Sequence, residues 1–324
     1  ALLLAATTIA ILFSATSCNR EPEMVQTEHR VLVLGFDGMD PKLLTRFMKE
    51  ADFPNIKKLI SVNGLRTLHT SNPPQSPVAW SNFITGKNPG GHAIFDFIHR
   101  KPGAYVPYLS TSRTSAPDRS FSIGKYDIPI SGGGVELLRK GKAFWEFLDD
   151  ERIPATIFRI PSNFPPVESG RSLSGMGTPD LLGGYGSFTY FTEREMNKPD
   201  LTGGKIVQVS AIGDGHFECE LQGPTNSMVK GNPVLSSSFD VWVDPENPAA
   251  KFEVAGETFV LEEGQWSDWV RLEFEMIPMV SNVSGIAMFY LKKAHPFFQL
   301  YVTPINIDPV NPAMPISHPT DYSK

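Results

Sequence analysis

Two residues of the chain combine a reactive side chain with a position that suits phosphate chemistry. Asp37 stands directly after the apolar run of residues 31–36, on an Asp-Gly turn, and Ser76 precedes Pro77 and a segment with helical character. A carboxylate at the carboxyl end of a buried strand is well placed to hold a metal ion. A hydroxyl at a helix N-terminus lies beside unpaired N–H groups, which help to bind phosphate and to stabilise an alkoxide.

Each residue also has an ordinary structural interpretation. Asp37 suits an Asx turn or the cap of the following helix, and its position alone leaves these roles and the metal-ligand role open. Ser76 suits the N-cap position, with Pro77 at the first helical position. The cap and the nucleophile are compatible for Ser76, because a helix start would position and polarise the hydroxyl. We therefore predict that Ser76 begins a helix.

The segments around these residues alternate between strand and helix patterns. Residues 31–36 form a continuous apolar run, which is typical of a strand buried on both faces of a parallel sheet. This alternation predicts an α/β domain with a parallel sheet and flanking helices over residues 29–202. The other elements that we expect are helices at 41–51 and 54–64, a strand at 65–70, a helix after Ser76, a loop-rich stretch at 87–134, a helix at 134–154 and a strand at 155–160.

The pattern changes near Gly203. From there, short alternating segments are bounded by turn residues, which indicates an all-β unit such as a small sandwich or a curled sheet. We expect this β-rich subdomain to cover residues 203–305 and to be an insertion in the α/β domain. Residues 306–324 then read as a return segment that is truncated before a further helix or strand.

The N-terminus predicts export. Residues 1–18 form an apolar run that ends in small residues at Cys18, as in a secretory signal or the cleavage box of a bacterial lipoprotein. Residues 19–28 are polar and read as a tether. We therefore expect a periplasmic protein or an outer-membrane lipoprotein, with membrane attachment through a lipidated Cys18.

Two stretches together, "VLVLGFDGMDP" and "SPVAWSNFITGKNPGGHAIFDF", resemble the alkaline phosphatase superfamily, and within it the type I phosphodiesterase/nucleotide pyrophosphatase group. Counting back from the Thr-Gly at residues 85–86 places Ser76 at the family's nucleophile, while Pro89 and His92 match its Pro-x-x-His. The resemblance implies an alkaline-phosphatase-like fold, with Asp37 and Ser76 as metal ligands. It also implies two divalent ions, zinc by expectation, and hydrolysis of a small-molecule phosphate ester, mono or di, through a phosphoserine.

Some features depart from the family pattern. Phe97 stands where these phosphodiesterases place a phosphate-binding Asn, so the substrate stays open. The family's Asp-x-x-x-His and Asp-His motifs, which supply further metal ligands, do not occur in the sequence. We therefore expect the remaining ligands beyond Lys324, and the chain to be an incomplete and inactive form of a longer enzyme.

Composition limits the alternatives. The net charge of -6 gives no basic footprint for nucleic acid. Two other functions stay open: an exported, non-enzymatic binding protein that uses its β-rich insertion, and a phosphoryl transferase related to phosphoglycerate mutase. The pattern does not predict an oligomeric state.

Overall fold

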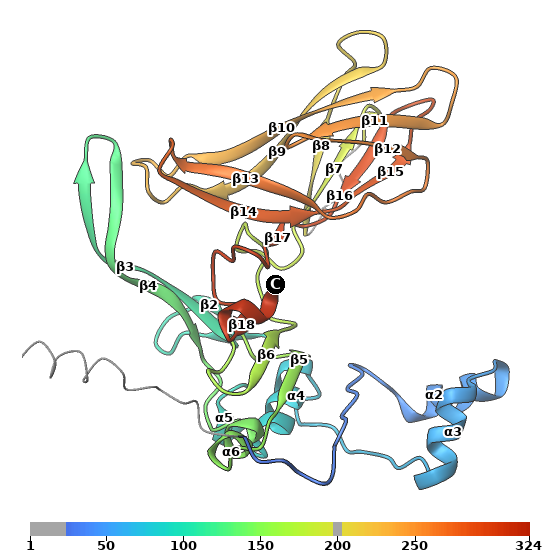
Figure 1. The fold of residues 1–324 in the computed structure, drawn as a ribbon, viewed down its shortest axis with the longest axis vertical. Coiled ribbons are helices and arrows are strands. Elements are labelled where there is room, and N and C mark those ends of the chain that lie inside the picture. Colours follow the sequence, from blue (N-terminus) through green and yellow to red (C-terminus); the bar gives the residue numbers. More distant parts are fainter. Residues whose placement is uncertain (1–23, 197–202) are drawn as a thin grey trace, which may run out of the picture.

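The computed structural model describes residues 24–196 and 203–324. The predicted signal or lipoprotein segment with Cys18 lies outside the described residues. Figure 1 shows two parts, with a β-rich part at the upper end and a smaller mixed part of helices and strands below it. Within the described ranges, no helix is both long and apolar enough to cross a membrane.

Among the described residues, the α-helices lie in the first half of the chain, and several of them begin at a proline. The helices are α2 (Pro41–Glu50), α3 (Pro54–Asn63), α4 (Ser76–Thr85), α5 (Pro89–His92), α6 (Phe144–Asp150) and the C-terminal 3-10 helix η1 (Thr320–Ser323). Proline suits the first turn of a helix because the backbone N–H groups there have no acceptor within the helix. The N–H that proline lacks therefore costs the helix no hydrogen bond. Asp40 caps α2 by accepting hydrogen bonds from the backbone N–H groups of Lys42 and Leu43. The predicted helices at 41–51 and 54–64 are confirmed.

The mixed part holds a small three-stranded sheet beside α4, α5 and α6. Its strand order is β18–β6–β5, with β5 (Thr156–Ile160) parallel to β6 (Arg171–Ser174) and β18 (Ser317–His318) antiparallel to β6. Behind β5 lies a core of Ile84, Ala143, Trp145 and Ile157. The strand predicted at 155–160 is confirmed.

The β-rich part consists of strands β7 to β17 in three sheets around one core. The strand orders are β12–β11–β10–β9, β13–β14–β17 and β15–β16–β7–β8, and only β7 and β8 pair in parallel. Strict alternation builds this core: in β9, for example, Phe217, Cys219 and Leu221 are buried between exposed neighbours. The bounds are β7 (Phe188–Thr192), β8 (Gly204–Gln208), β9 (His216–Thr225), β10 (Val234–Val243), β11 (Ala249–Val254), β12 (Glu257–Glu262), β13 (Val270–Ile277), β14 (Ser281–Ala287), β15 (Phe289–Lys293), β16 (Gln299–Val302) and β17 (Asn306–Ile307).

A long hairpin links the two parts. Its strands are β3 (Ser112–Ile123) and β4 (Tyr126–Leu137), and Figure 1 shows it rising from the mixed part alongside the β-rich part. The backbone N–H of Asp127 donates to the carbonyl of Met228 at 2.9 Å, and that of Lys230 donates to the carbonyl of Lys125 at 2.9 Å. The hairpin tip is therefore hydrogen-bonded to the loop between β9 and β10. A shorter hairpin, β1 (Ile98–Arg100) and β2 (Pro107–Leu109), lies at its base.

Several predicted elements are wrong. Residues 31–36 form no strand, and their side chains other than Gly35 are 60% to 87% exposed. A β-strand needs at least one hydrogen-bonded neighbour, and no described segment pairs with this run. The segment 65–70 also forms no strand. The stretch 87–134 contains most of the β3–β4 hairpin, whose Ser, Pro and Gly residues obscure its alternation.

The helix predicted at 134–154 is much shorter than expected. Residues up to Leu137 belong to β4, and α6 covers only Phe144–Asp150. Gly141 has a φ of 87°, a left-handed value that a helix interior does not contain. The chain therefore changes from strand to helix inside the predicted element.

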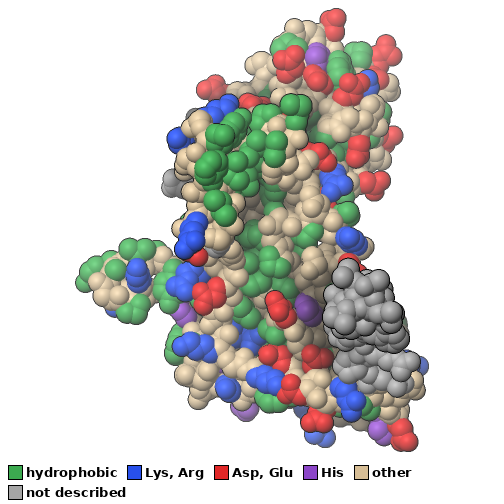
Figure 2. Space-filling model, turned by 60° about the vertical axis from the view of Figure 1, so that its left-hand side comes forward, with side chains coloured by type: hydrophobic (Ala, Val, Ile, Leu, Met, Phe, Trp, Pro, Cys, Tyr) green, Lys and Arg blue, Asp and Glu red, His purple; other side chains and the backbone are tan. Residues whose placement is uncertain are grey.

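Figure 2 shows that hydrophobic and acidic side chains gather at the β-rich end of the face that it presents. An acidic surface repels polyanions. This distribution on the visible face agrees with the net charge of -6.

Candidate active site at Asp37 and Ser76

The structure brings Asp37 and Ser76 together. Ser76 Oγ donates a hydrogen bond to Asp37 Oδ2 at 3.0 Å, and Trp80 Nε1 donates to Asp37 Oδ1 at 3.0 Å. Ser76 and Trp80 are four residues apart on α4 and therefore lie on the same helix face. One face of α4 thus presents two donors to a single carboxylate.

The backbone on the Asp37 side is shaped for this contact. Gly38 has a φ of 65°, which turns the chain immediately after Asp37. A Cβ at Gly35 would lie 2.4 Å from the Trp80 ring, so only glycine permits the chain to approach α4 so closely. The sequence run that was expected to be a strand therefore reaches α4 as an extended, unpaired segment.

The start of α4 corrects one prediction. The N-cap is Gln75, and Ser76 is the first helical residue. The Ser76 hydroxyl bonds Asp37 instead of a backbone N–H of its own helix. Ser76 therefore begins the helix without capping it, and its side chain is directed at the neighbouring segment.

His92 lies on the far side of α4 and supports the helix. It is fully buried, its Nε2 is 2.6 Å from the side-chain amide of Asn82, and its Nδ1 accepts a hydrogen bond from the backbone N–H of Ile94 at 3.1 Å. Burial, and secondarily the positive charge of Arg139, lower the pKa of His92 below its usual value. His92 is therefore a neutral, structural histidine, as the sequence indicated.

The loop after β5 contacts the beginning of α4. Ser162 Oγ donates to the carbonyl of Pro77 at 3.3 Å, and Arg139 Nε donates to the carbonyl of Ser162 at 3.2 Å. Arg139 is 5% exposed, and its burial lowers the pKa of the guanidinium to about 10. These contacts fix the residue that follows Ser76 against the small sheet.

A cavity of about 260 Å³ adjoins Asp37. It lies between the segment Val33 to Asp37, the aromatic residues of α4 and α6, and strand β5. Trp80, Phe83 and Phe144 form successive edge-to-face contacts along one wall, with ring centroids 6.0 and 5.7 Å apart. Arg159 of β5 lines the same cavity.

Sequence reasoning missed Trp80 and Arg159. The four-residue spacing from Ser76 to Trp80 on a predicted helix was a signal that could have identified the tryptophan. Arg159 carried no such signal, because regular alternation along β5 would have directed its side chain to the same face as buried Ile157.

The described residues do not fit the two-metal site that the resemblance implies. A protein zinc ion takes three or four protein ligands, mostly from Cys, His and acidic side chains. In residues 24–196 and 203–324, no group of three or more such residues is placed to hold an ion. Asp37 and Ser76 offer one carboxylate and one hydroxyl, which is too few for even a single structural site.

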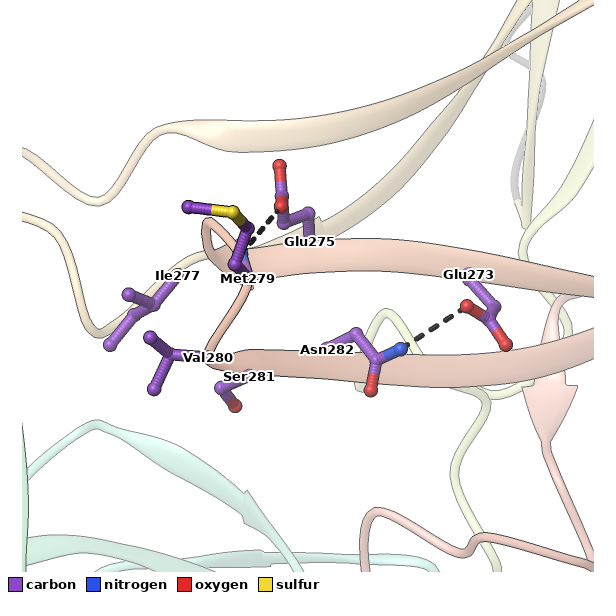
Figure 3. A pocket seen from close by; sticks show the side chains of 7 residues that line it. All are labelled: Glu273, Glu275, Ile277, Met279, Val280, Ser281 and Asn282. Atoms are coloured by element: carbon purple, nitrogen blue, oxygen red, sulfur yellow. Dashed lines mark hydrogen bonds between the residues drawn. The ribbon is translucent and has the colours of Figure 1, made fainter.

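A second cavity, of about 380 Å³, lies at the turn between β13 and β14 (Figure 3). Its side chains bond within the hairpin: Asn282 donates to Glu273 at 3.1 Å, and the backbone N–H of Met279 donates to Glu275 at 3.0 Å. The described lining has two carboxylates but no basic side chain. It offers nothing to hold a phosphate, and we assign no site to it.

Residues 31–168 match the family model of type I phosphodiesterase/nucleotide pyrophosphatase. The match contains Asp37, Ser76 and the β5 strand, and it confirms the resemblance that the two sequence stretches indicated. The family supports a phosphate ester hydrolase in general terms. Comparison with curated proteins and with solved structures gave no match.

Proposed function

We propose that the protein hydrolyses phosphate esters with Ser76 as the nucleophile. The observation that carries this proposal is the 3.0 Å hydrogen bond from Ser76 Oγ to Asp37, within the segment that matches the phosphodiesterase family. Ser76 is half-buried at the start of α4, at the positive end of the helix dipole. Pro77 has no N–H and the N–H groups of Val78 and Ala79 donate to the carbonyl of Gln75, so the dipole and the N–H of Ser76 are what this helix start offers to a phosphate.

The reaction would proceed in two displacements. Ser76 Oγ forms a bond to phosphorus, the ester P–O bond breaks, and the alcohol departs with a proton from water. The proton of Ser76 passes to the Asp37 carboxylate, which already accepts it in a hydrogen bond. The hydroxide that remains from that water then attacks the phosphoserine phosphorus and the bond to Ser76 Oγ breaks, which releases inorganic phosphate from a monoester substrate or a phosphate monoester from a diester, while Asp37 returns the proton to Ser76 Oγ.

We further propose that activity requires divalent ions, with zinc as the expected metal, because the matched family is generally metal-dependent. Asp37 and Ser76 would be the ligands from this part of the chain. Since the described residues do not complete a site, no step of the reaction is assigned to the ion.

The test is hydrolysis of p-nitrophenyl phosphate and bis(p-nitrophenyl) phosphate by a complete version of the enzyme, with the ligands expected beyond Lys324, and by its Ser76→Ala variant. We expect Ser76→Ala to lose at least about a thousandfold in kcat, because the covalent route is removed. Mass spectrometry of the wild type quenched in acid should detect one phosphoryl group on the peptide that contains Ser76. The same assay with and without a chelator tests the metal requirement.

Ser61→Ala is the matched control, because Ser61 is an exposed serine on α3 that bonds only the carbonyl of Lys58. It should keep wild-type activity. Equal activity of wild type and Ser76→Ala would exclude Ser76 as the nucleophile.

A further inference from the structure

Arg159 is held in an unusual backbone conformation beside the Asp37 cavity. Its φ of 56° lies in the left-handed region, which costs a residue other than glycine about 1–3 kcal/mol. The β5–β6 register shifts between Phe158 and Ile160, so that Arg159 is the extra residue of a β-bulge. Opposite the bulge, a Cβ at Gly175 would lie 2.0 Å from the Arg159 carbonyl oxygen. The glycine is therefore necessary for the bulge.

The bulge determines where the arginine side chain lies. Ile157 is 6% exposed and belongs to the core behind β5, and in a regular strand Arg159 would share its face. Burying a guanidinium in that core would be costly. With the bulge, Phe158 and Arg159 are both exposed, and Arg159 lines the cavity that contains Asp37. Bulges near active sites commonly redirect a side chain in this way.

The cavity has the charge that a phosphate requires. Among its described lining residues, Arg159 is the basic side chain and Asp37 the acidic one. Arg159 is exposed, and no ion pair among the described residues engages its guanidinium. A guanidinium presents two parallel N–H groups that match two phosphate oxygens.

We propose that Arg159 binds the phosphate group of the substrate at the Asp37–Ser76 site and favours phosphate monoesters over diesters. This inference rests on the proposed function. Near neutral pH a monoester carries close to two negative charges and has three non-bridging oxygens, whereas a diester carries one charge and has two. The attraction to a fixed cation grows with the charge of the anion. Arg159 therefore binds a monoester more tightly than a diester.

The experiment measures binding by isothermal titration calorimetry on the full chain at pH 8. The probes are phenylphosphonate, a dianion, and its monomethyl ester, a monoanion of nearly the same shape. We expect the wild type to bind the dianion at least about tenfold more tightly. Arg159→Met should lower the affinity for the dianion at least about tenfold and that for the monoanion less than about twofold. Arg159→Lys should retain an intermediate preference.

Arg152→Met is the matched control. Arg152 is also exposed and left-handed, with a φ of 57°, and does not line the cavity. It should bind both probes like the wild type. Thermal unfolding midpoints of all variants show whether any variant is misfolded. If Arg159→Met is misfolded, the affinities of Arg159→Lys for the two probes provide the test instead.

Three results would overturn the inference: no binding of the dianion by the wild type, equal losses in Arg159→Met and Arg152→Met, or equal weakening of both probes. The proposed function fails separately. Dianion binding that depends on Arg159, without any ester hydrolysis, would remove the proposed reaction and leave the binding site. Hydrolysis that needs Ser76 but is unchanged in Arg159→Met would support the proposed reaction and exclude Arg159 as the phosphate-binding residue.

Discussion

His92 supports helix α4 from a position away from Asp37 and Ser76. Its ring is enclosed between Asn82 of α4 and the backbone of Ile94, and Arg139 lies nearby. The neutral imidazole fits this position because one ring nitrogen accepts a hydrogen bond and burial disfavours a charge. Protonation of His92 would therefore loosen the support of the helix that carries Ser76.

Stability should fall on acidification in a way that depends on His92. Because the pKa of His92 is lowered in the folded state, the unfolded chain binds more protons between that lowered value and the usual 6.5. The His92 contribution is thus fully present above pH 6.5 and is lost as the pH falls through the window below it. The free energy of unfolding, measured in urea at several pH values between 8 and 5, should change less with pH for His92→Gln than for the wild type. The same pH dependence in both proteins would contradict this account.

At the scale of elements, close approaches between strands depend on particular glycines. Gly223 of β9 faces Phe274 of β13, which is 1% exposed, and a Cβ at Gly223 would lie 2.2 Å from the Phe274 ring. The two strands belong to different sheets, so this contact sets how closely the sheets pack. Close-packed interiors have no room for an added methyl group unless their neighbours move.

Gly223→Ala should therefore destabilise the protein by about 1–3 kcal/mol, the cost of overpacking a core. The measurement is the free energy of unfolding in urea. Gly134→Ala is the control, because a Cβ at Gly134 of β4 meets nothing within 4 Å. Its effect should stay within about 0.5 kcal/mol. An equal effect of the two substitutions would show that lost backbone freedom, and not the Phe274 contact, matters.

Local patterns predicted some elements well. Helices α2 and α3 follow from a proline at the first turn and, for α3, Gly64 after the last, and the strands of the β-rich part follow from alternation such as that of β9. The run 31–36 failed because burial is not a local property: its side chains are apolar, but no described strand lies beside it. The β5 bulge was equally invisible, since it depends on the backbone at Gly175.

The candidate site was predictable to a similar extent. The proximity of Asp37 to Ser76 followed from matching two motifs to one family, because the residues are 39 positions apart and no periodicity relates them. The second donor to Asp37, Trp80, could be predicted from its four-residue spacing to Ser76 on a helix. The position of Arg159 at the cavity could not be predicted, because it arises from a bulge between two strands.

At the scale of the whole molecule, apolar surface is unevenly covered. The strands of the β-rich part enclose one large core, whereas the run 31–36 in the other part stays exposed. Leu32 is 81% exposed, in a run of five large apolar side chains. Contiguous apolar surface of this kind promotes association between molecules.

We therefore expect self-association at high concentration that Leu32→Lys combined with Leu34→Lys relieves. Burying a leucine is worth about 1.5–3 kcal/mol, so the association constant should fall at least about tenfold. Sedimentation velocity would measure it. Met279→Lys is the control, because Met279 is 99% exposed in the β13–β14 turn. A wild type that stays monomeric, or equal relief by the control, would contradict the prediction.

The pairing of β7 with β16 has a consequence for biosynthesis. Tyr190 and Gln299, which are hydrogen-bonded across these strands, are 109 residues apart. At 5–20 residues per second, β7 leaves the ribosome roughly 5–20 seconds before its partner. During that interval the nascent chain has a strand with one edge unpaired, and such an edge is a template for pairing with another chain. Because translation is sequential, this edge of β7 stays unpaired until β16 has been synthesised.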